Sequence, residues 1–284
     1  MRWLPVLAVA LVACGGSEPR RAATTPTPTP GPRWPGPVVF VAERDGSLDV
    51  FAHDGSRVRR LTRGSRDEFS PNWHGDRIVY RVNPPRNDAG DIWVMRSDGS
   101  GKRNLTRSPG VPDWSPAFAP DGRTIAYMSA FELWLMDADG RNRRQLTRAG
   151  SLSEYPSWSP DGRSLAFSGV RGGDFEIVRI DVAGGAERNL TDSPGDDKWP
   201  AWSPDGDRIA YVSDDDVWVM AADGTRPRNV TRTPDLVEAH PSWTPDGRLS
   251  FLQHGESGPV HVRVLDPAGA YDLPIDAVFV FDWR

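Results

Sequence analysis

Acidic side chains recur at nearly regular intervals along this chain, each close to a large ring. Four of the acids stand five residues before a Trp or Phe, and a fifth stands four residues before one. The acids are Glu68, Asp113, Glu154, Asp197 and Glu238, and the neighbouring rings are Phe69, Trp114, Tyr155, Trp199 and His240. Carboxylates serve as acids, bases and hydrogen-bond acceptors, and rings anchor ligands. The pattern predicts a binding face, although residues that recur so regularly can equally serve the repeat itself.

Sequence motifs of the common enzyme classes are not found. The chain has no Gly-x-Ser-x-Gly, no His-Glu-x-x-His and no Gly-rich phosphate loop. Its five histidines are scattered at positions 53, 74, 240, 254 and 261, so their spacing predicts no imidazole metal centre. We therefore assign no catalytic residue, no metal ligand and no cofactor. Ca²⁺ stays open as an alternative, because carboxylate oxygens suit that ion.

The Trp or Phe that follows each acid belongs to an internal repeat. The clearest copy, YPSWSPDGRSLAF, covers residues 155–167, and related copies surround Trp73, Phe118, Trp202 and Trp243. The intervals between these aromatic residues are 45, 40, 44 and 41 residues. A period in the low forties, built from short strands and turn residues, is typical of β-propeller blades.

Each copy predicts four strands, which we letter a to d. A Pro-Asp-Gly turn follows strand a, an Asp-Gly turn follows strand c, and strand d ends in Asn-Leu-Thr or a related triplet. Further acids occupy the predicted b–c loops and the start of strand c: Asp91, Glu132, Glu176, Asp214, Asp215 and Asp216. Strands b and c occur six times but strand a only five, and Trp283 follows Trp243 by forty residues. We predict an all-β, six-bladed propeller closed by the C-terminal strand, which pairs into the first blade.

The first residues predict export. Residues 1–13 contain Arg2 and an apolar run too short to cross a bilayer as a mature helix, as in a secretory signal peptide. The run ends in Leu11-Val12-Ala13-Cys14, which resembles the lipobox of bacterial lipoproteins, whose Cys is lipidated; Cys14 is the only cysteine. Residues 14–37 form a Pro-rich tether, and the propeller is predicted over residues 38–284. The net charge of −5 argues against a nucleic-acid partner.

The repeated motif resembles that of a known family. Trp-Ser-Pro-Asp-Gly-Arg-x-Ile-Ala-Tyr, followed by Asp-φ-Trp-Val-Met (φ apolar) and Asn-Leu-Thr, is similar to the WD40-like repeats of the TolB-type β-propeller, and the resemblance covers residues 38–284. It implies a protein of the bacterial cell envelope that works through interactions with other proteins. TolB itself carries an N-terminal α/β domain where this chain has the Pro-rich tether.

We therefore expect a monomeric, non-enzymatic binding or scaffold protein, exported and lipid-anchored through Cys14, which presents one propeller face to an envelope protein or peptide. The predicted mouth, formed by the acids and rings, lies opposite the Pro-Asp-Gly turns and the chain ends, so it faces away from the membrane. One alternative is an enzyme that acts on envelope polymers, a glycan or peptide hydrolase or lyase using the mouth carboxylates. An enzyme needs residues that break the repeat, whereas a binding protein can use the repeated ones. A sensor of a small ligand or of Ca²⁺ is the third possibility.

Overall fold

The computed structural model describes residues 34–84, 89–148, 150–256, 258–267, 269–275 and 278–283. The chain divides into residues 1–33 and residues 34–284. The predicted signal peptide, Cys14 and most of the predicted tether lie outside the described residues. The described part contains strands only, and it has no helix long and apolar enough to cross a membrane.

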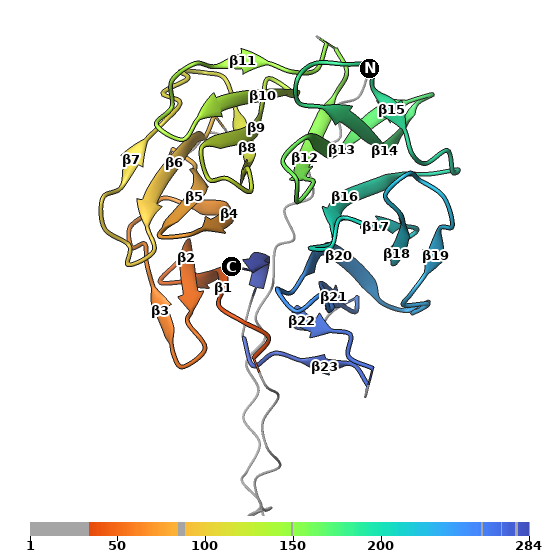
Figure 1. Cartoon of the computed structure of the whole chain (residues 1–284). Helices are drawn as coiled ribbons and strands as arrows, with labels where there is room; N and C mark the ends of the chain where they lie inside the picture. The colour runs from red at the N-terminus through yellow and green to blue at the C-terminus, as the bar shows by residue number, and fades with distance from the viewer. Residues whose placement is uncertain are drawn as a thin grey trace, which may run out of the picture. The chain divides into compact units, whose positions relative to one another are not determined.

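Six four-stranded antiparallel sheets surround a central axis (Figure 1). Blade 1 contains β24 (Val278–Trp283), β1 (Val38–Arg44), β2 (Ser47–His53) and β3 (Val58–Arg60). Blade 2 contains β4 (Glu68–His74), β5 (Arg77–Val82), β6 (Asp91–Arg96) and β7 (Arg103–Asn104). Blade 3 contains β8 (Asp113–Phe118), β9 (Thr124–Ser129), β10 (Glu132–Asp137) and β11 (Arg144–Gln145). Blade 4 contains β12 (Ser153–Trp158), β13 (Ser164–Arg171), β14 (Asp174–Asp181) and β15 (Arg188–Asn189). Blade 5 contains β16 (Asp197–Trp202), β17 (Arg208–Ser213), β18 (Asp216–Ala221) and β19 (Arg228–Asn229), and blade 6 contains β20 (Val237–Trp243), β21 (Leu249–His254), β22 (His261–Val264) and β23 (Tyr271–Asp272).

The hydrophobic core lies between the blades. Strand b of each blade is buried on both faces, as in β5, where the five residues from Ile78 to Val82 are all buried. One such core joins Val79 and Ile92 of blade 2 to Phe118 and Ile125 of blade 3. A sheet that is covered on both sides carries continuous apolar runs instead of a polar alternation. Each blade therefore completes its core only with its neighbour, and the ring must close to bury the last one.

The predicted closure is confirmed. β24 pairs antiparallel with β1, with Val38 opposite Trp283 and Phe40 opposite Phe281. The C-terminal strand thus supplies strand a of blade 1, and the chain forms the predicted all-β, six-bladed propeller. Because closure joins the two ends of a long chain, it removes two exposed sheet edges that could otherwise pair with other chains.

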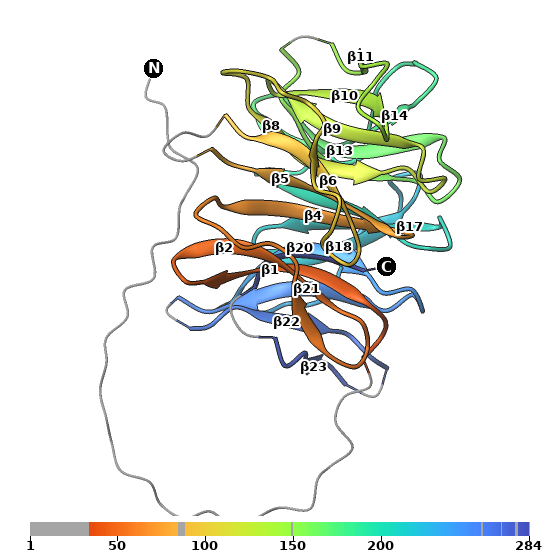
Figure 2. The same ribbon diagram turned by 90° about the vertical axis from the view of Figure 1, so that its left-hand side faces the viewer.

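The strands run between the two faces of the ring (Figure 2). We call the face with the a–b and c–d turns the turn face, and the face with the d–a and b–c connections the loop face. The first residue of β1, Val38, pairs with Trp283 near the end of the chain. A Cβ on Gly36 would lie 3.2 Å from Pro245, which belongs to the a–b turn of blade 6. The described chain ends therefore lie on the turn face, as the sequence predicts.

Candidate functional site

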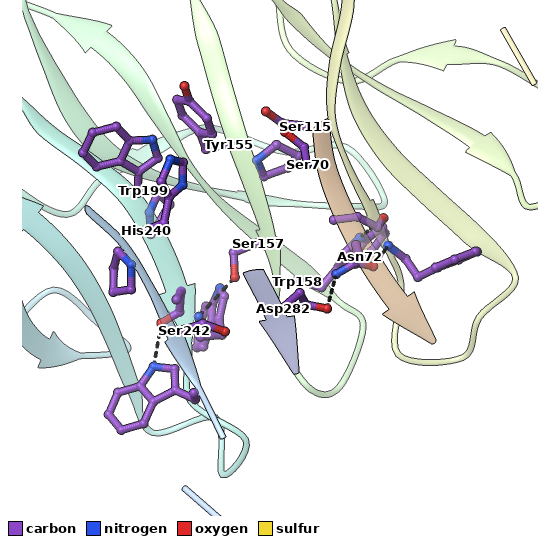
Figure 3. A pocket seen from close by; sticks show the side chains of 18 of the residues that line it. Ser70, Asn72, Ser115, Tyr155, Ser157, Trp158, Trp199, His240, Ser242 and Asp282 are labelled. Atoms are coloured by element: carbon purple, nitrogen blue, oxygen red, sulfur yellow. Dashed lines mark hydrogen bonds between the residues drawn. The ribbon is translucent and has the colours of Figure 1, made fainter. Parts of the chain in front are cut away.

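A cavity of about 340 Å³ occupies the channel at the centre of the ring. Its walls come from the strands a, which contribute the Pro-x-Trp segments and the residues just before them. From the loop face to the turn face the wall runs from Ser70, Ser115, Tyr155, Trp199 and His240 to Pro120, Pro160 and Pro204. Figure 3 shows the three rings on one side of the cavity and the two serines on another.

A backbone irregularity shapes the loop-face end of this channel. The residue three before the Trp or Phe has a left-handed φ in five blades: Ser70 (47°), Ser115 (48°), Tyr155 (53°), Trp199 (56°) and His240 (49°). The register of strand a against strand b shifts at the same point in each of these blades. Such a bulge redirects a side chain at a local cost in free energy. At the loop-face end each of these five blades therefore turns this one residue toward the channel, and the sequence decides what it is.

Three neighbouring blades place rings there. The ring centroids of Tyr155 and Trp199 lie 5.8 Å apart, those of Tyr155 and His240 5.9 Å, and those of Trp199 and His240 4.8 Å. These separations are those of favourable aromatic pairs. Blades 2 and 3 have serines at the same position, so the loop-face end of the channel is aromatic on one side only. We call Tyr155, Trp199 and His240 the channel rings.

The channel rings are uncharged near neutral pH. Burial lowers the pKa of His240 to about 4, because a charged imidazolium would lose its hydration. Burial also raises the pKa of Tyr155, which keeps its phenol protonated. The channel rings therefore present π faces and neutral polar groups to whatever enters the channel.

The other two predicted rings have a different role. Phe69 and Trp114 stand one residue earlier in strand a, outside the set of residues that line the cavity. The fully buried guanidinium of Arg81 lies 3.1 Å from the ring centroid of Trp114 and 5.6 Å from that of Phe69. Cation–π contact of this kind stabilises a buried guanidinium. Phe69 and Trp114 thus pack blades 2 and 3 together around Arg81.

The predicted carboxylates lie in the interior, which differs from the expectation of an acidic mouth. Glu68, Asp113, Asp197 and Glu238 are buried, and Glu154 is half-buried. Burial raises the pKa of Glu68 to about 7 and also raises the pKa values of Asp113 and Glu154.

Hydrogen bonds give two of these acids a structural role. Glu68 accepts one from Thr62 of the preceding blade at 3.0 Å. Glu238 accepts one from the backbone N–H of Val217, also in the preceding blade, at 2.9 Å. Glu68 and Glu238 therefore join successive blades.

The acids at the start of strand c also belong to the repeat. In blade 3 the hydroxyl of Thr147 accepts a hydrogen bond from the N–H of Leu133 at 2.9 Å and donates one to Glu132 at 3.0 Å. Blades 2, 4 and 5 make the corresponding bonds to Asp91, Glu176 and Asp216. The Thr of Asn-Leu-Thr thus ties strand d to strand c. Asp214 and Asp215, by contrast, are exposed in the b–c turn of blade 5.

Asp282 is a channel residue that the sequence reasoning missed. It lines the cavity, and its carboxylate accepts hydrogen bonds from the side-chain amide of Asn72 at 3.0 Å and from the N–H of Trp73 at 3.1 Å. Burial raises its pKa to about 7. Alignment of Phe281-Asp282-Trp283 with the Pro-x-Trp copies would have found it, since the other copies have only Asn, Ala or Ser at x.

The described residues contain no group of three or more His, Cys, Asp or Glu side chains arranged to hold a metal ion. The cavity wall itself carries three titratable side chains, those of Tyr155, His240 and Asp282. Its chemistry is therefore that of neutral rings, hydroxyl groups and one carboxyl group.

This fold and channel define a six-bladed β-propeller. The chain belongs to the family of the TolB beta propeller domain, whose model matches residues 76–272. The predicted TolB-type propeller is thereby confirmed. A comparison with curated proteins found no match.

Solved structures share the fold at low sequence identity. TolB from Acinetobacter baumannii is 19% identical with a TM-score of 0.73, and the match covers 88% of this chain and 67% of that one. A putative TolB from Agrobacterium tumefaciens is 20% identical with a TM-score of 0.67, and the match covers 85% of this chain and 89% of that one. An oligogalacturonate lyase from Vibrio parahaemolyticus is 12% identical with a TM-score of 0.57, and the match covers 85% of this chain and 72% of that one. Propellers of this shape thus occur in proteins with different activities.

Proposed function

We propose that this protein is a non-enzymatic cell-envelope protein that binds a segment of a partner protein or a peptide at the loop-face end of its channel. The observation that carries the proposal is the cluster of channel rings. Tyr155, Trp199 and His240 occupy a repeat position at which blades 2 and 3 have serines. The requirements of the fold are met by Ser at that position, so the rings add something that the fold does not need.

The size of the cavity sets the kind of ligand. A volume of about 340 Å³ is at the small end of the range for ligand sites, so it admits a few side chains of an extended segment. The channel rings supply stiff apolar surface, and Ser70 and Ser115 supply hydrogen-bonding groups across from them. Tyr, Trp and similar anchors at the centre of an interface commonly contribute most of its binding energy. An aromatic, apolar or cationic side chain at the tip of the partner segment suits these faces.

The sequence and the position of the described chain ends support a proposal for the setting of the protein. We propose that Cys14 is lipidated after removal of residues 1–13 and that the Pro-rich residues 14–37 hold a monomeric propeller away from the membrane. The described N-terminal residues lie on the turn face, next to the a–b turn of blade 6. The loop face with its channel rings then points away from the membrane, where a partner can reach it.

Site-specific photo-crosslinking in cells tests this proposal. A benzoyl-phenylalanine replaces Ser115 at the loop-face end of the channel in one variant and Asp121 on the turn face in the matched control. We expect a specific adduct only from position 115. Purified partner should then bind Trp199→Ala and His240→Ser at least about tenfold more weakly than the parent. Equal capture from both positions, or unchanged affinity in variants that melt like the parent, would contradict the proposal.

Asp282 favours a second candidate, an enzyme acting on envelope polymers. A carboxyl group with a pKa near 7 in a cavity is typical of general acids and bases. Its hydrogen bonds to Asn72 and Trp73 link blade 1 to blade 2 and account for its presence without a reaction. Purified peptidoglycan fragments incubated with the parent and with Asp282→Asn distinguish the two. We expect no turnover by either; turnover by the parent alone would establish the enzyme.

A further inference from the structure

Three exposed apolar side chains gather on the loop face around blade 3. Val111 is 36% exposed, Phe131 43% and Leu152 41%, and the described residues contain only one other exposed large hydrophobic side chain, Val58. Val111 precedes blade 3, Phe131 lies in its b–c turn, and Leu152 follows it. Backbone hydrogen bonds connect the three loops, from Ala130 N–H to the Pro112 carbonyl at 3.4 Å and from Ser153 N–H to the Phe131 carbonyl at 2.7 Å. We call Val111, Phe131 and Leu152 the blade 3 patch.

The b–c turn of blade 3 has a backbone conformation that its two residues disfavour. Ala130 and Phe131 form a two-residue turn in which both φ angles are positive, 50° and 66°. The corresponding turns of blades 1 and 4 use Asp45-Gly46 and Gly172-Gly173, the residue types that such turns favour. A side chain as large as Phe disfavours this conformation. The fold would be served better by Gly at position 131, so the exposed ring has another use.

No core contact explains the patch. None of its three residues belongs to the six inter-blade cores of the described chain. Leu152 also has a positive φ, of 44°. Each of the three side chains keeps more than a third of its surface exposed, so burial within the chain only partly offsets the cost of the strained backbone. Strained residues of this kind commonly mark binding surfaces.

Two arginines flank the patch at equivalent places. Arg107 stands four residues before Val111 and Arg148 four residues before Leu152, and both are exposed. Neither side chain takes part in an ion pair or hydrogen bond within the described residues. A carboxylate of a partner can therefore pair with each guanidinium without breaking an existing contact.

A second sector of the loop face, two blades away from the patch, carries the other sign of charge. Around blade 5 Asp196 pairs with Lys198 at 2.6 Å, and the exposed Asp192, Asp214, Asp215 and Asp235 outnumber the exposed Arg232. This separation of charge disfavours two other binding partners for the patch. A flat anionic membrane surface would meet the acidic sector as well as the patch, and a second copy joined patch to patch would bring arginine against arginine. A narrow acidic segment can contact the blade 3 sector alone.

We propose that the blade 3 patch docks an acidic amphipathic segment of a partner protein, whose apolar side chains cover Phe131 and Leu152 and whose carboxylates pair with Arg107 and Arg148. This site is separate from the channel rings, and its existence does not depend on a ligand in the channel. It gives the loop face a second contact, set to one side of the channel.

A synthetic peptide tests the proposal directly. The probe is acetyl-Glu-Leu-Glu-Phe-Glu-Leu-Glu-amide, and the control peptide has Lys in place of each Glu. Isothermal titration calorimetry on the full chain should show binding of the Glu peptide, weakened as the salt concentration rises from about 20 to about 300 mM. The Lys peptide should not bind. Absence of binding by the Glu peptide, or equal binding of both peptides, overturns the proposal.

Variants locate the site and separate it from a role in folding. Phe131→Gly, Leu152→Ser and Arg148→Gln should each lower the affinity for the Glu peptide by about tenfold or more. Val58→Ser, which changes the exposed apolar residue outside the patch, should bind like the parent. Phe131→Gly should melt at the same temperature as the parent or higher, because Gly accepts the positive φ. If Phe131→Gly binds the peptide normally, or if phosphatidylglycerol vesicles bind the parent while the peptide does not, the assignment is wrong.

Discussion

One position in strand a shows how a repeated chain builds a singular site. The bulge three residues before each Trp or Phe recurs in five blades, with φ between 47° and 56°. Ser70 and Ser115 show that a small side chain satisfies the fold there. Tyr155, Trp199 and His240 use the same backbone to bring three rings together. The functional content of the channel therefore rests on single side chains and not on the repeat.

Two acids, the buried Glu68 and the half-buried Asp282 in the channel wall, make the stability of the propeller depend on pH. Burial raises the pKa values of Glu68 and Asp282 to about 7, above their usual values in an unfolded chain. At pH values between the pKa of each acid in the unfolded chain and its pKa in the folded chain, the native state holds more protons than the unfolded state. The free energy of unfolding therefore falls as pH rises through this window and levels off above about pH 7.

We expect Asp282→Asn to reduce this dependence. The Asn oxygen can still accept the hydrogen bonds from Asn72 and Trp73, but the side chain cannot ionise. The stability gained by the variant over the parent should therefore be about 3 kcal/mol larger near pH 8 than near pH 5. Urea unfolding at both pH values measures the difference, and Glu68→Gln provides an independent second case. A parent that is equally stable at both pH values would contradict the assignment.

At the scale of elements, the c–d turns are contacts between blades as well as ends of hairpins. Gly99, Gly140 and Gly224 all have φ between 85° and 88°. A Cβ on each would lie 2.9 Å from a backbone carbonyl oxygen of the preceding blade, that of Leu61, Leu105 or Leu190. Gly55, in the same turn of blade 1, has a φ of 94° and no atom within 4 Å of such a Cβ.

This difference gives a matched pair of variants. Gly55→Ala meets only the backbone cost of a positive φ, so it should destabilise the protein by about 1 kcal/mol. Gly140→Ala meets that cost and pushes against a rigid carbonyl, so it should destabilise by about 3 kcal/mol. Chemical denaturation of both variants at one pH checks the order. Equal losses would show that the c–d turn does not hold blade 3 against blade 2.

At the scale of the whole molecule, closure and the position of the chain ends determine how the propeller can be presented. β24 pairs with β1, and the described N-terminal residues contact the turn face of blade 6. In the proposed lipid-anchored arrangement the tether joins the turn face, which leaves the loop face accessible to a partner. The channel rings and the blade 3 patch both lie on that loop face, so one partner can contact both.

We expect Cys14→Ala to move the protein from the membrane fraction to the soluble fraction of fractionated cells, because a cysteine is required for the predicted lipid attachment. Its propeller should melt like that of the parent, since position 14 lies outside the blades. Immunoblots of salt-washed membranes measure the distribution. Retention of the variant on washed membranes would contradict the lipid anchor.

Much of the architecture was predictable from sequence because each blade repeats a local pattern. Pro-Asp-Gly and Asp-Gly turns, apolar strand runs and a forty-residue period specify blades one at a time, and counting them leads to six and to closure through Trp283. Each of these signals lies within a few consecutive residues, so it can be recognised in the sequence without knowing how the blades pack together.

Tertiary structure alone decided which recurring residues face the channel. The acid and the ring stand side by side in sequence, yet Glu68 and Asp113 are buried between blades, Phe69 and Trp114 enclose Arg81, and Tyr155 meets two rings from other blades. A one-residue bulge shifts the side-chain alternation of strand a, and only pairing with strand b reveals the shift. The channel rings come from positions more than forty residues apart, so the physical reason for their meeting is the curvature of the closed ring.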